Sequence, residues 1–260
     1  MAKKPPFIAG NWKMHKTIPE SIDLTTAIIK ASTDLAEAEI VLAPPFTALS
    51  EASKILGGSA VRLAAQNLHW EDKGAFTGEV SAPMLKDAGC RYVIIGHSER
   101  RQYFEETDAG VNRKIKAALK SGVFPIVCIG ESLAERENRE TMVVVSRQLE
   151  GGLEGIAGEG FEPVIVAYEP VWAIGTGKTA TPAQAEEVHA HIREELARRY
   201  GNGPAECAII LYGGSVKPAN AFALLSERNI DGFLVGGASL EAESFIQIVR
   251  EAIKAYKEKK

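Results

Sequence analysis

Eight short apolar runs recur along the chain at nearly regular intervals. They cover residues 7–12, 39–44, 61–67, 92–97, 124–130, 163–169, 207–214 and 231–237. Most are too short and too continuously apolar for half-exposed antiparallel strands, which would alternate apolar and polar residues. The runs are therefore predicted to be strands of a parallel sheet that is covered on both faces.

Amphipathic segments with helix start and stop signals lie between these runs. Thr181 precedes Pro182, and Gln184 completes a capping box, so a helix is predicted to begin here and to end at Gly201. Near the C-terminus, one apolar helical face is formed by Phe245, Ile248, Val249, Ala252 and Ile253. Strand and helix patterns thus alternate along the chain.

The spacing of the runs predicts the fold. Seven intervals separate Phe7 from Asp231, about 32 residues each, which suits one strand–helix unit repeated eight times. Eight such units in 260 residues predict a closed (β/α)8 barrel, and residues 1–260 are expected to form a single domain because no linker divides them. A doubly wound open sheet is the alternative, but its G-x-G-x-x-G motif would follow the first strand, where the chain reads GNWK.

Composition and charge narrow the classes of function. The net charge of −4 argues against non-specific binding to nucleic acid or to an anionic membrane. The three cysteines, without C-x-x-C spacing, fit neither a disulfide framework nor a zinc site. No apolar run has the length of a membrane span, and the N-terminus lacks the apolar stretch of a signal peptide. We expect a reduced, cytoplasmic protein with neither a membrane nor a nucleic-acid partner.

The segment GTGKT resembles part of a phosphate-binding P-loop. That motif needs a glycine six residues before its lysine, and the residue six before Lys178 is Trp172. More informative is Glu169, which ends the sixth apolar run and directly precedes Pro170. The pattern places a carboxylate at the end of a buried strand, followed by a glycine-containing segment that could close over a bound molecule.

Other polar residues follow the predicted strands in the same way. In a (β/α)8 barrel the C-terminal strand ends surround one mouth, where the chemistry takes place. Asn11 and Lys13 follow the first run, His97 the fourth and Glu169 the sixth. Each alone has an ordinary explanation as a solvated charge, a core histidine or an ion-pair partner. Glycine-rich turns after the last two runs lie where barrels commonly hold phosphate, and they contain Ser215, Gly236 and Gly237.

This set of groups suits proton abstraction next to a carbonyl. A base such as Glu169 removes the proton, while His97 and Lys13 stabilise negative charge on the carbonyl oxygen. The sequence shows no metal-ligand cluster and no dinucleotide motif, so we expect neither metal nor cofactor. Three alternatives remain at this point. A metal-using epimerase would need more ligands, a Schiff-base aldolase would need a lysine in place of Glu169, and a non-catalytic phosphate binder would have no use for Glu169 with His97.

Five segments, AGNWKM, GHSERR, AYEPVWAIGTGKTATP, LYGGSV and VGGASL, resemble those of the triosephosphate isomerase family. Their order and spacing match along nearly the whole chain. The resemblance implies a TIM barrel enzyme of glycolysis and gluconeogenesis. Its reaction would interconvert dihydroxyacetone phosphate and D-glyceraldehyde 3-phosphate through an enediol(ate), without metal or cofactor.

The resemblance also implies a role for each matched residue. Glu169 would be the base that moves a proton between C1 and C2. His97 would be the electrophile, kept neutral by the N-terminus of the short helix that follows it. Lys13 would bind the substrate's negative charge, and Asn11 would help to orient the carbonyl. The phosphate would accept hydrogen bonds from the backbone N–H groups of Gly175, Ser215, Gly236 and Gly237.

In this reading GTGKT is part of a lid rather than a P-loop. The lid would close to keep water from the enediolate. It would comprise Pro170, Val171, Trp172, Ala173, Ile174, Gly175, Thr176, Gly177 and Lys178.

The connection after the third run is unusually long, from Gln66 to Met84. We expect Trp70 and Phe76 at its tip, where apolar rings would prefer burial. In the resembled family this loop inserts beside the active site of a second subunit, so a homodimer is implied. The alternative is a loop folded back on its own barrel.

The implied dimer contacts involve three further residues. Thr77 would reach the partner's Asn11 and the partner's Lys13. Glu79 would lie near the partner's Arg100. Each subunit would then hold a complete set of catalytic residues but depend on its partner for their support.

Overall fold

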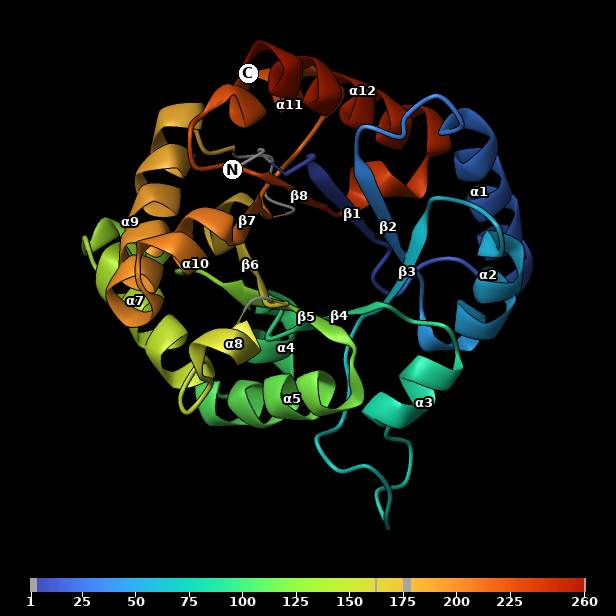
Figure 1. Ribbon diagram of the computed structural model, residues 1–260, viewed down its shortest axis with the longest axis horizontal. Helices are drawn as coiled ribbons and strands as arrows, with labels where there is room; N and C mark the ends of the chain where they lie inside the picture. The colour runs from blue at the N-terminus through green and yellow to red at the C-terminus, as the bar shows by residue number, and fades with distance from the viewer. Residues whose placement is uncertain (1–3, 162, 175–178, 260) are drawn as a thin grey trace.

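Parallel strands close into a barrel ringed by helices in the computed structural model, which describes residues 4–161, 163–174 and 179–259 (Figure 1). The strands are β1 (Phe7–Asn11), β2 (Glu39–Ala43), β3 (Arg62–Ala65), β4 (Tyr92–Ile95), β5 (Phe124–Ile129), β6 (Ile165–Tyr168), β7 (Ile209–Tyr212) and β8 (Gly232–Val235). Each predicted run contains one of them. Pairing of β1 with β8 closes the barrel, so the (β/α)8 prediction is confirmed and the open sheet is wrong.

Helices connect successive strands on the outside of the barrel. The α-helices are α1 (Ile18–Ala31), α2 (Leu49–Leu56), α3 (Ala82–Asp87), α4 (Ser98–Tyr103), α5 (Asp108–Ser121), α6 (Leu133–Glu137), α7 (Thr141–Gly152), α8 (Gly158–Phe161), α9 (Pro182–Tyr200), α10 (Asn202–Cys207), α11 (Pro218–Ser226) and α12 (Ala242–Glu258). The 3-10 turns of the described residues are η1 (Phe46–Ala48), η2 (Val171–Ala173) and η3 (Gly237–Leu240). No helix in the described ranges is both long and apolar enough to cross a membrane.

The predicted start of α9 is confirmed. The Thr181 hydroxyl accepts the N–H of Gln184 across 3.2 Å, and the Gln184 side chain accepts the N–H of Thr181 across 3.0 Å. These reciprocal hydrogen bonds satisfy backbone donors that an uncapped helix would leave unpaired. Gly201 follows the last residue of α9, as its position in the sequence predicts.

Two apolar layers explain why the strands are apolar throughout. Alternate residues point into the barrel interior, among them Ala9, Val41 and Leu211, and their neighbours point outward against the helices. Both strand faces are therefore buried, as in other parallel sheets. The predicted apolar face of α12 is buried in the outer layer. The polar residues are left at the strand ends, where they can face a common mouth.

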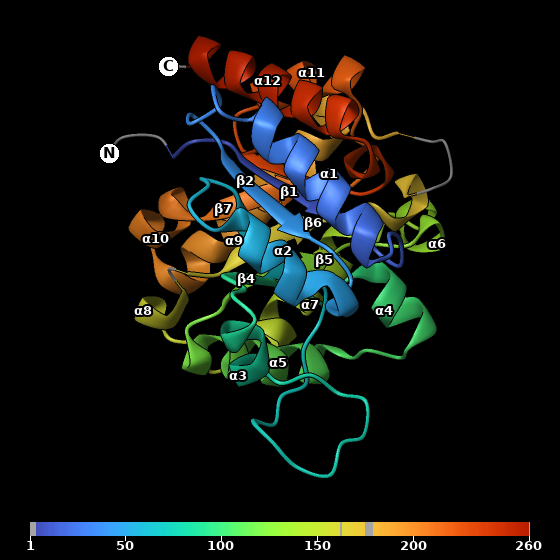
Figure 2. The same cartoon turned by 90° about the vertical axis from the view of Figure 1, so that its right-hand side faces the viewer.

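The loop after β3 projects away from the barrel (Figures 1 and 2). At its base the N–H of His69 donates to the carbonyl of Val80 across 2.8 Å, and residues 71–79 beyond it are exposed. The alternative of a loop folded back on its own barrel is therefore wrong. The expected place of Trp70 is also wrong, because this ring lies at the base with the Arg113 guanidinium 3.9 Å from its centre. Phe76 is on the projecting part and is 43% exposed.

Candidate active site

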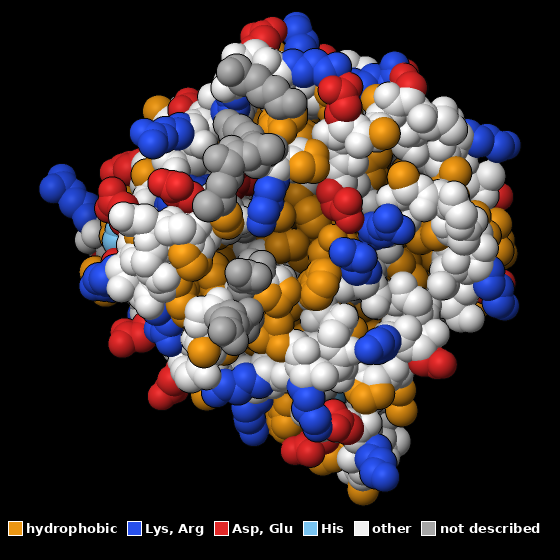
Figure 3. Space-filling view, in the orientation of Figure 1, with side chains coloured by type: hydrophobic (Ala, Val, Ile, Leu, Met, Phe, Trp, Pro, Cys, Tyr) orange, Lys and Arg blue, Asp and Glu red, His pale blue; other side chains and the backbone are white. Residues whose placement is uncertain are grey.

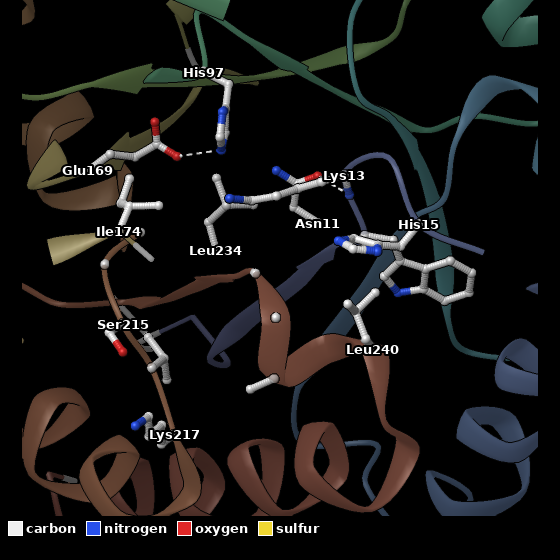
Figure 4. Close-up of a pocket in the computed structure, with 17 residues that line it drawn as sticks. Asn11, Lys13, His15, His97, Glu169, Ile174, Ser215, Lys217, Leu234 and Leu240 are labelled. Atoms are coloured by element: carbon white, nitrogen blue, oxygen red, sulfur yellow. Dashed lines mark hydrogen bonds and ion pairs between the residues drawn. The ribbon is translucent and has the colours of Figure 1, made fainter. Parts of the chain in front are cut away.

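A cavity of about 370 Å³ opens at the C-terminal ends of the strands. Its walls come from the segments after β1, β4, β6, β7 and β8 (Figure 4). Figure 3 shows the opposite end of the barrel, at the N-terminal ends of the strands, where hydrophobic side chains lie at the centre and charged side chains surround them. The structure brings together these predicted site residues: Asn11, Lys13, His97, Glu169, Ser215, Gly236 and Gly237. Gly175 lies outside the described residues.

Glu169 is buried at the end of β6, with 2% of its surface exposed. Its Oε1 lies 3.1 Å from Nε2 of His97, and its Oε2 accepts the backbone N–H of Ser98 across 2.9 Å. A Cβ at Gly213 would lie 2.8 Å from Cγ of Glu169, so glycine leaves room for this side chain. The carboxylate is thus held by two donors against the wall of the cavity.

His97 is the residue that precedes α4, and its ring caps that helix. Its Nδ1 accepts the N–H of Glu99 across 3.2 Å. A nitrogen that accepts a hydrogen bond carries no proton, so the proton of the neutral ring is on Nε2. Nε2 therefore donates its N–H toward Glu169. The same N–H could instead donate a hydrogen bond to a carbonyl oxygen bound in the cavity.

Lys13 occupies the left-handed backbone region, with φ of 53°. Such a conformation costs a non-glycine residue about 1 kcal/mol or more. The Lys13 N–H donates to Oδ1 of Asn11 across 3.1 Å, which supports the turn. Its Nζ reaches Oε1 of Glu99 at 2.6 Å. Sequence reasoning assigned no role to Glu99. The one indication in the sequence that Glu99 belongs to the site is its position two residues after His97.

The glycine-rich turns complete the cavity on the side opposite His97. A Cβ on Gly214 would lie 2.2 Å from the Tyr212 hydroxyl, so this turn needs glycine for packing. Gly237 differs, because a Cβ there would meet nothing within 4 Å. Gly237 begins η3, and the Ser239 hydroxyl donates to the Gly236 carbonyl across 2.7 Å. Backbone N–H groups at such a helix start suit an anion.

The predicted lid begins directly after Glu169. Pro170, Val171, Trp172, Ala173 and Ile174 are described, and Val171–Ala173 form η2, whereas Gly175, Thr176, Gly177 and Lys178 lie outside the described residues. Ile174 lines the cavity.

A buried carboxylate anchors the first part of this segment. Oε1 of Glu131 accepts the Trp172 indole N–H across 2.9 Å and the Tyr168 hydroxyl across 3.2 Å. Arg136 lies 3.2 Å from the same oxygen. Burial and the nearby Glu131 charge raise the pKa of Tyr168 well above its ordinary value, so this hydroxyl stays a donor. Sequence reasoning missed Glu131, although it comes two residues after the end of β5, much as Glu169 follows β6.

The predicted interface residues belong to the loop after β3 and to α4. Thr77 and Glu79 are exposed on the projecting loop. Arg100 is on α4, where its Nε lies 3.4 Å from Oε2 of Glu106 and its guanidinium covers the Phe104 ring at 4.8 Å.

With this geometry established, comparison with known proteins identifies the family. The family model described as triosephosphate isomerase matches residues 6–252. The chain belongs to the triosephosphate isomerase family. It is 55% identical over 247 residues to the triosephosphate isomerase of Trichlorobacter lovleyi, covering 95% of this chain and 98% of that protein. It is 57% identical to that of Moorella thermoacetica, with 94% and 97% covered.

A solved structure agrees with the assignment. The crystal structure of triosephosphate isomerase from Bartonella henselae is 45% identical, covers 97% of this chain and 99% of its own, and gives a TM-score of 0.85. Triosephosphate isomerases interconvert dihydroxyacetone phosphate and D-glyceraldehyde 3-phosphate in glycolysis. The chain is therefore an aldose–ketose isomerase with this reaction. The epimerase, aldolase and non-catalytic alternatives are set aside.

Proposed function

We propose that the triose phosphate isomerisation takes place in the 370 Å³ cavity and is carried out by Glu169, His97, Lys13 and Asn11. One observation carries this proposal. Oε1 of Glu169 lies 3.1 Å from Nε2 of His97, whose Nδ1 accepts the N–H of Glu99. A carboxylate and a neutral imidazole N–H therefore face the same space, as proton abstraction next to a carbonyl requires.

Glu169 is the base in the proposed reaction. It takes a proton from C1 of dihydroxyacetone phosphate, and the electron pair of that C–H bond moves toward the carbonyl to give an enediolate. Return of the proton at C2 gives glyceraldehyde 3-phosphate. Both carboxylate oxygens already have donors. Substrate binding must therefore release at least the hydrogen bond from Ser98 before the carboxylate can turn to the carbon acid.

His97, Lys13 and Asn11 act on the oxygen atoms in this proposal. The Nε2–H of His97 donates to the carbonyl oxygen, supplies a proton to it, and recovers one from the neighbouring hydroxyl as the second carbonyl forms. The Lys13 ammonium stabilises the negative charge, and the Asn11 side chain helps to orient the carbonyl. These groups are fixed before the substrate enters, which lowers the reorganisation that charge development would otherwise require.

The phosphate binds to the glycine-rich turns in the same proposal. Backbone N–H groups of Ser215, Gly236 and Gly237 line that side of the cavity, and Gly175 would add a fourth donor from the lid. The segment Pro170–Lys178 closes over the bound substrate and excludes water. No metal or cofactor takes part.

We also propose that the enzyme is a cytoplasmic homodimer. Met14 is 94% exposed directly beside Lys13, and Phe76 is 43% exposed on the projecting loop. A second copy of the chain would cover both apolar side chains if the loop of each subunit sat beside the partner's Lys13. Thr77, Glu79 and Arg100 lie at this interface in the proposed dimer.

The first experiment is a coupled assay of dihydroxyacetone phosphate turnover with and without EDTA, for the wild type and for Glu169→Gln. Full wild-type activity in EDTA is expected because side chains supply all of the chemistry. The Gln variant should retain the fold but lose kcat by about 10³-fold. Activity that disappears in EDTA, or a Gln variant with a tenth of wild-type kcat, would overturn the proposal.

A further inference from the structure

In the described part of the chain, one lysine at the cavity has no acidic partner. Among the described residues that line it, Glu169 is the acidic one, and Lys13 and Lys217 are the lysines. Lys13 is paired with Glu99 at 2.6 Å, so its charge is partly offset. Lys217 is exposed and forms no ion pair with an acidic side chain of the described ranges. The family activity does not explain this lysine.

Lys217 stands at the phosphate side of the cavity. It comes two residues after Ser215 and directly before α11, and its N–H donates to Oδ1 of Asn220 across 2.8 Å. Asn220 also donates from Nδ2 to the Ser215 carbonyl across 3.0 Å, so one side chain ties both residues to the same turn. In Figure 4, Lys217 and Ser215 lie on the same side of the cavity, and Lys13 lies on the opposite side.

We propose that Lys217 is a positioning residue that steers the substrate into the cavity with its phosphate toward the turns after β7 and β8. The proposal rests on the site assigned above. A phosphate monoester carries close to two negative charges near pH 7. The chain itself carries −4, so the substrate meets a repulsive average field and needs a local positive potential at the mouth.

The position of the charge determines which kinetic constant it affects. A cation at the rim of a cleft raises the rate of encounter with an anion by up to orders of magnitude, and dissolved salt screens this effect within about 10 Å at 0.1 M. Lys217 stands apart from Glu169 and His97, which are in contact with each other on the other side of the cavity (Figure 4). Its charge should therefore change kcat/KM for phosphorylated substrates and leave kcat almost unaltered.

The test compares Lys217→Gln with the wild type over a range of ionic strength. At low salt we expect kcat/KM for glyceraldehyde 3-phosphate to fall about 5- to 10-fold, with kcat within about twofold. The difference should shrink at about 1 M salt, where screening is nearly complete. Lys217→Arg should restore the wild-type value. For D-glyceraldehyde, the neutral triose without phosphate, Lys217→Gln should match the wild type.

Lys86→Gln is the matched control. It removes the same charge from an exposed lysine of α3, at the other end of the barrel, beside the first residues of β3. It should keep wild-type kcat/KM at every salt concentration. Thermal unfolding checks the fold, and Lys217→Met is a second neutral variant if Lys217→Gln is unstable.

Three results would overturn the inference. They are an unchanged kcat/KM at low salt, an equal loss with the neutral triose, and a loss that Lys217→Arg fails to restore. None of these would affect the assignment of Glu169, which is tested by kcat of its own variants. Conversely, a fully active Glu169→Gln variant would refute Glu169 as the base. It would not change the salt dependence measured for Lys217→Gln.

Discussion

The backbone N–H of Ser98 donates to Oε2 of Glu169 across 2.9 Å, although the two residues are 71 positions apart in the sequence. Ser98 is the first residue of α4, and His97 caps the same helix. One helix start therefore positions both the imidazole and the carboxylate. A change in either side chain should act mainly on the chemistry, because the backbone of α4 holds the other group in place.

Substitutions of Glu169 test the proposed base. Glu169→Asp shortens the side chain by one methylene and should lower kcat by about 10²-fold, because a displaced base loses its alignment with the carbon acid. Glu169→Gln should lower it further, by about 10³-fold, since the amide cannot accept the proton. Steady-state kinetics measures both effects.

Binding of phosphoglycolate, a stable mimic of the enediolate, is the control for these variants. Calorimetry should show that both bind it, because the turns after β7 and β8 are untouched. If Glu169→Gln loses binding as severely as kcat, then Glu169 holds the site together rather than acting as its base.

Gly213→Ala tests whether the room beside Glu169 matters. The new Cβ would lie 2.8 Å from Cγ of Glu169 and 3.2 Å from the Tyr168 carbonyl, so the flexible carboxylate side chain must move. We expect kcat/KM to fall about 10-fold or more, because catalysis depends on the placement of this group. Gly203→Ala is the matched control, since its Cβ would meet nothing within 4 Å. Equal activity of the two variants would contradict this prediction.

Strand positions and the cap of α9 could be predicted because they depend on local patterns. Both faces of the barrel strands are buried, so the apolar runs mark them directly. Thr181 and Gln184 are three residues apart, so their reciprocal hydrogen bonds require no knowledge of tertiary structure. The polar residues at the strand ends were found for the same reason, since the fold itself brings them together.

Pairings between distant side chains could not be predicted in this way. The carboxylate of Glu99 reaches Lys13 across 86 sequence positions, and Glu131 reaches Trp172 across 41. Each of these contacts depends on the direction in which a loop side chain points. The hydrophobic periodicity of the sequence carries no information about that direction. Trp70 was misplaced for a similar reason, because the cation–π contact with Arg113 depends on how α5 lies beneath the loop.

His189 should make stability depend on pH. It is fully buried on α9, and burial lowers the pKa of its imidazole to about 3. Between the unfolded value near 6.5 and about 3, the unfolded chain binds a proton that the folded chain does not. The free energy of unfolding should therefore decrease as the pH is lowered. This residue alone should contribute a decrease of about 2 kcal/mol between pH 7.5 and pH 5.

Urea unfolding of His189→Gln at the two pH values measures this contribution. Glutamine can still donate toward the Asn229 carbonyl, which lies 3.3 Å from Nδ1 of His189. We expect the variant to be less sensitive to acid than the wild type by that amount, at a fixed protein concentration. His15→Gln removes an exposed imidazole as the control. A wild-type pH dependence in His189→Gln would refute the prediction.

Shortening the projecting loop tests the proposed dimer. Residues 71–77 are exposed, and the His69–Val80 hydrogen bond closes the loop below them, so a short glycine–serine link can replace them. Trp70 is kept, because its ring packs against Arg113 of the same chain. We expect a folded monomer by analytical sedimentation, since the link removes Phe76 and Thr77 from the interface.

The monomer should have much lower kcat, although Glu169 and His97 are unchanged. Lys13 holds a left-handed backbone conformation beside the 94% exposed Met14, and without a partner over Met14 this turn loses its external support. A site whose groups are loosely held loses on the order of 10²-fold in rate. Phe76→Ser with the loop at full length is the intermediate control, and it should weaken association in proportion to the apolar surface lost. A shortened variant that stays dimeric, or a monomer with wild-type kcat, would show that the loop neither builds the interface nor supports Lys13.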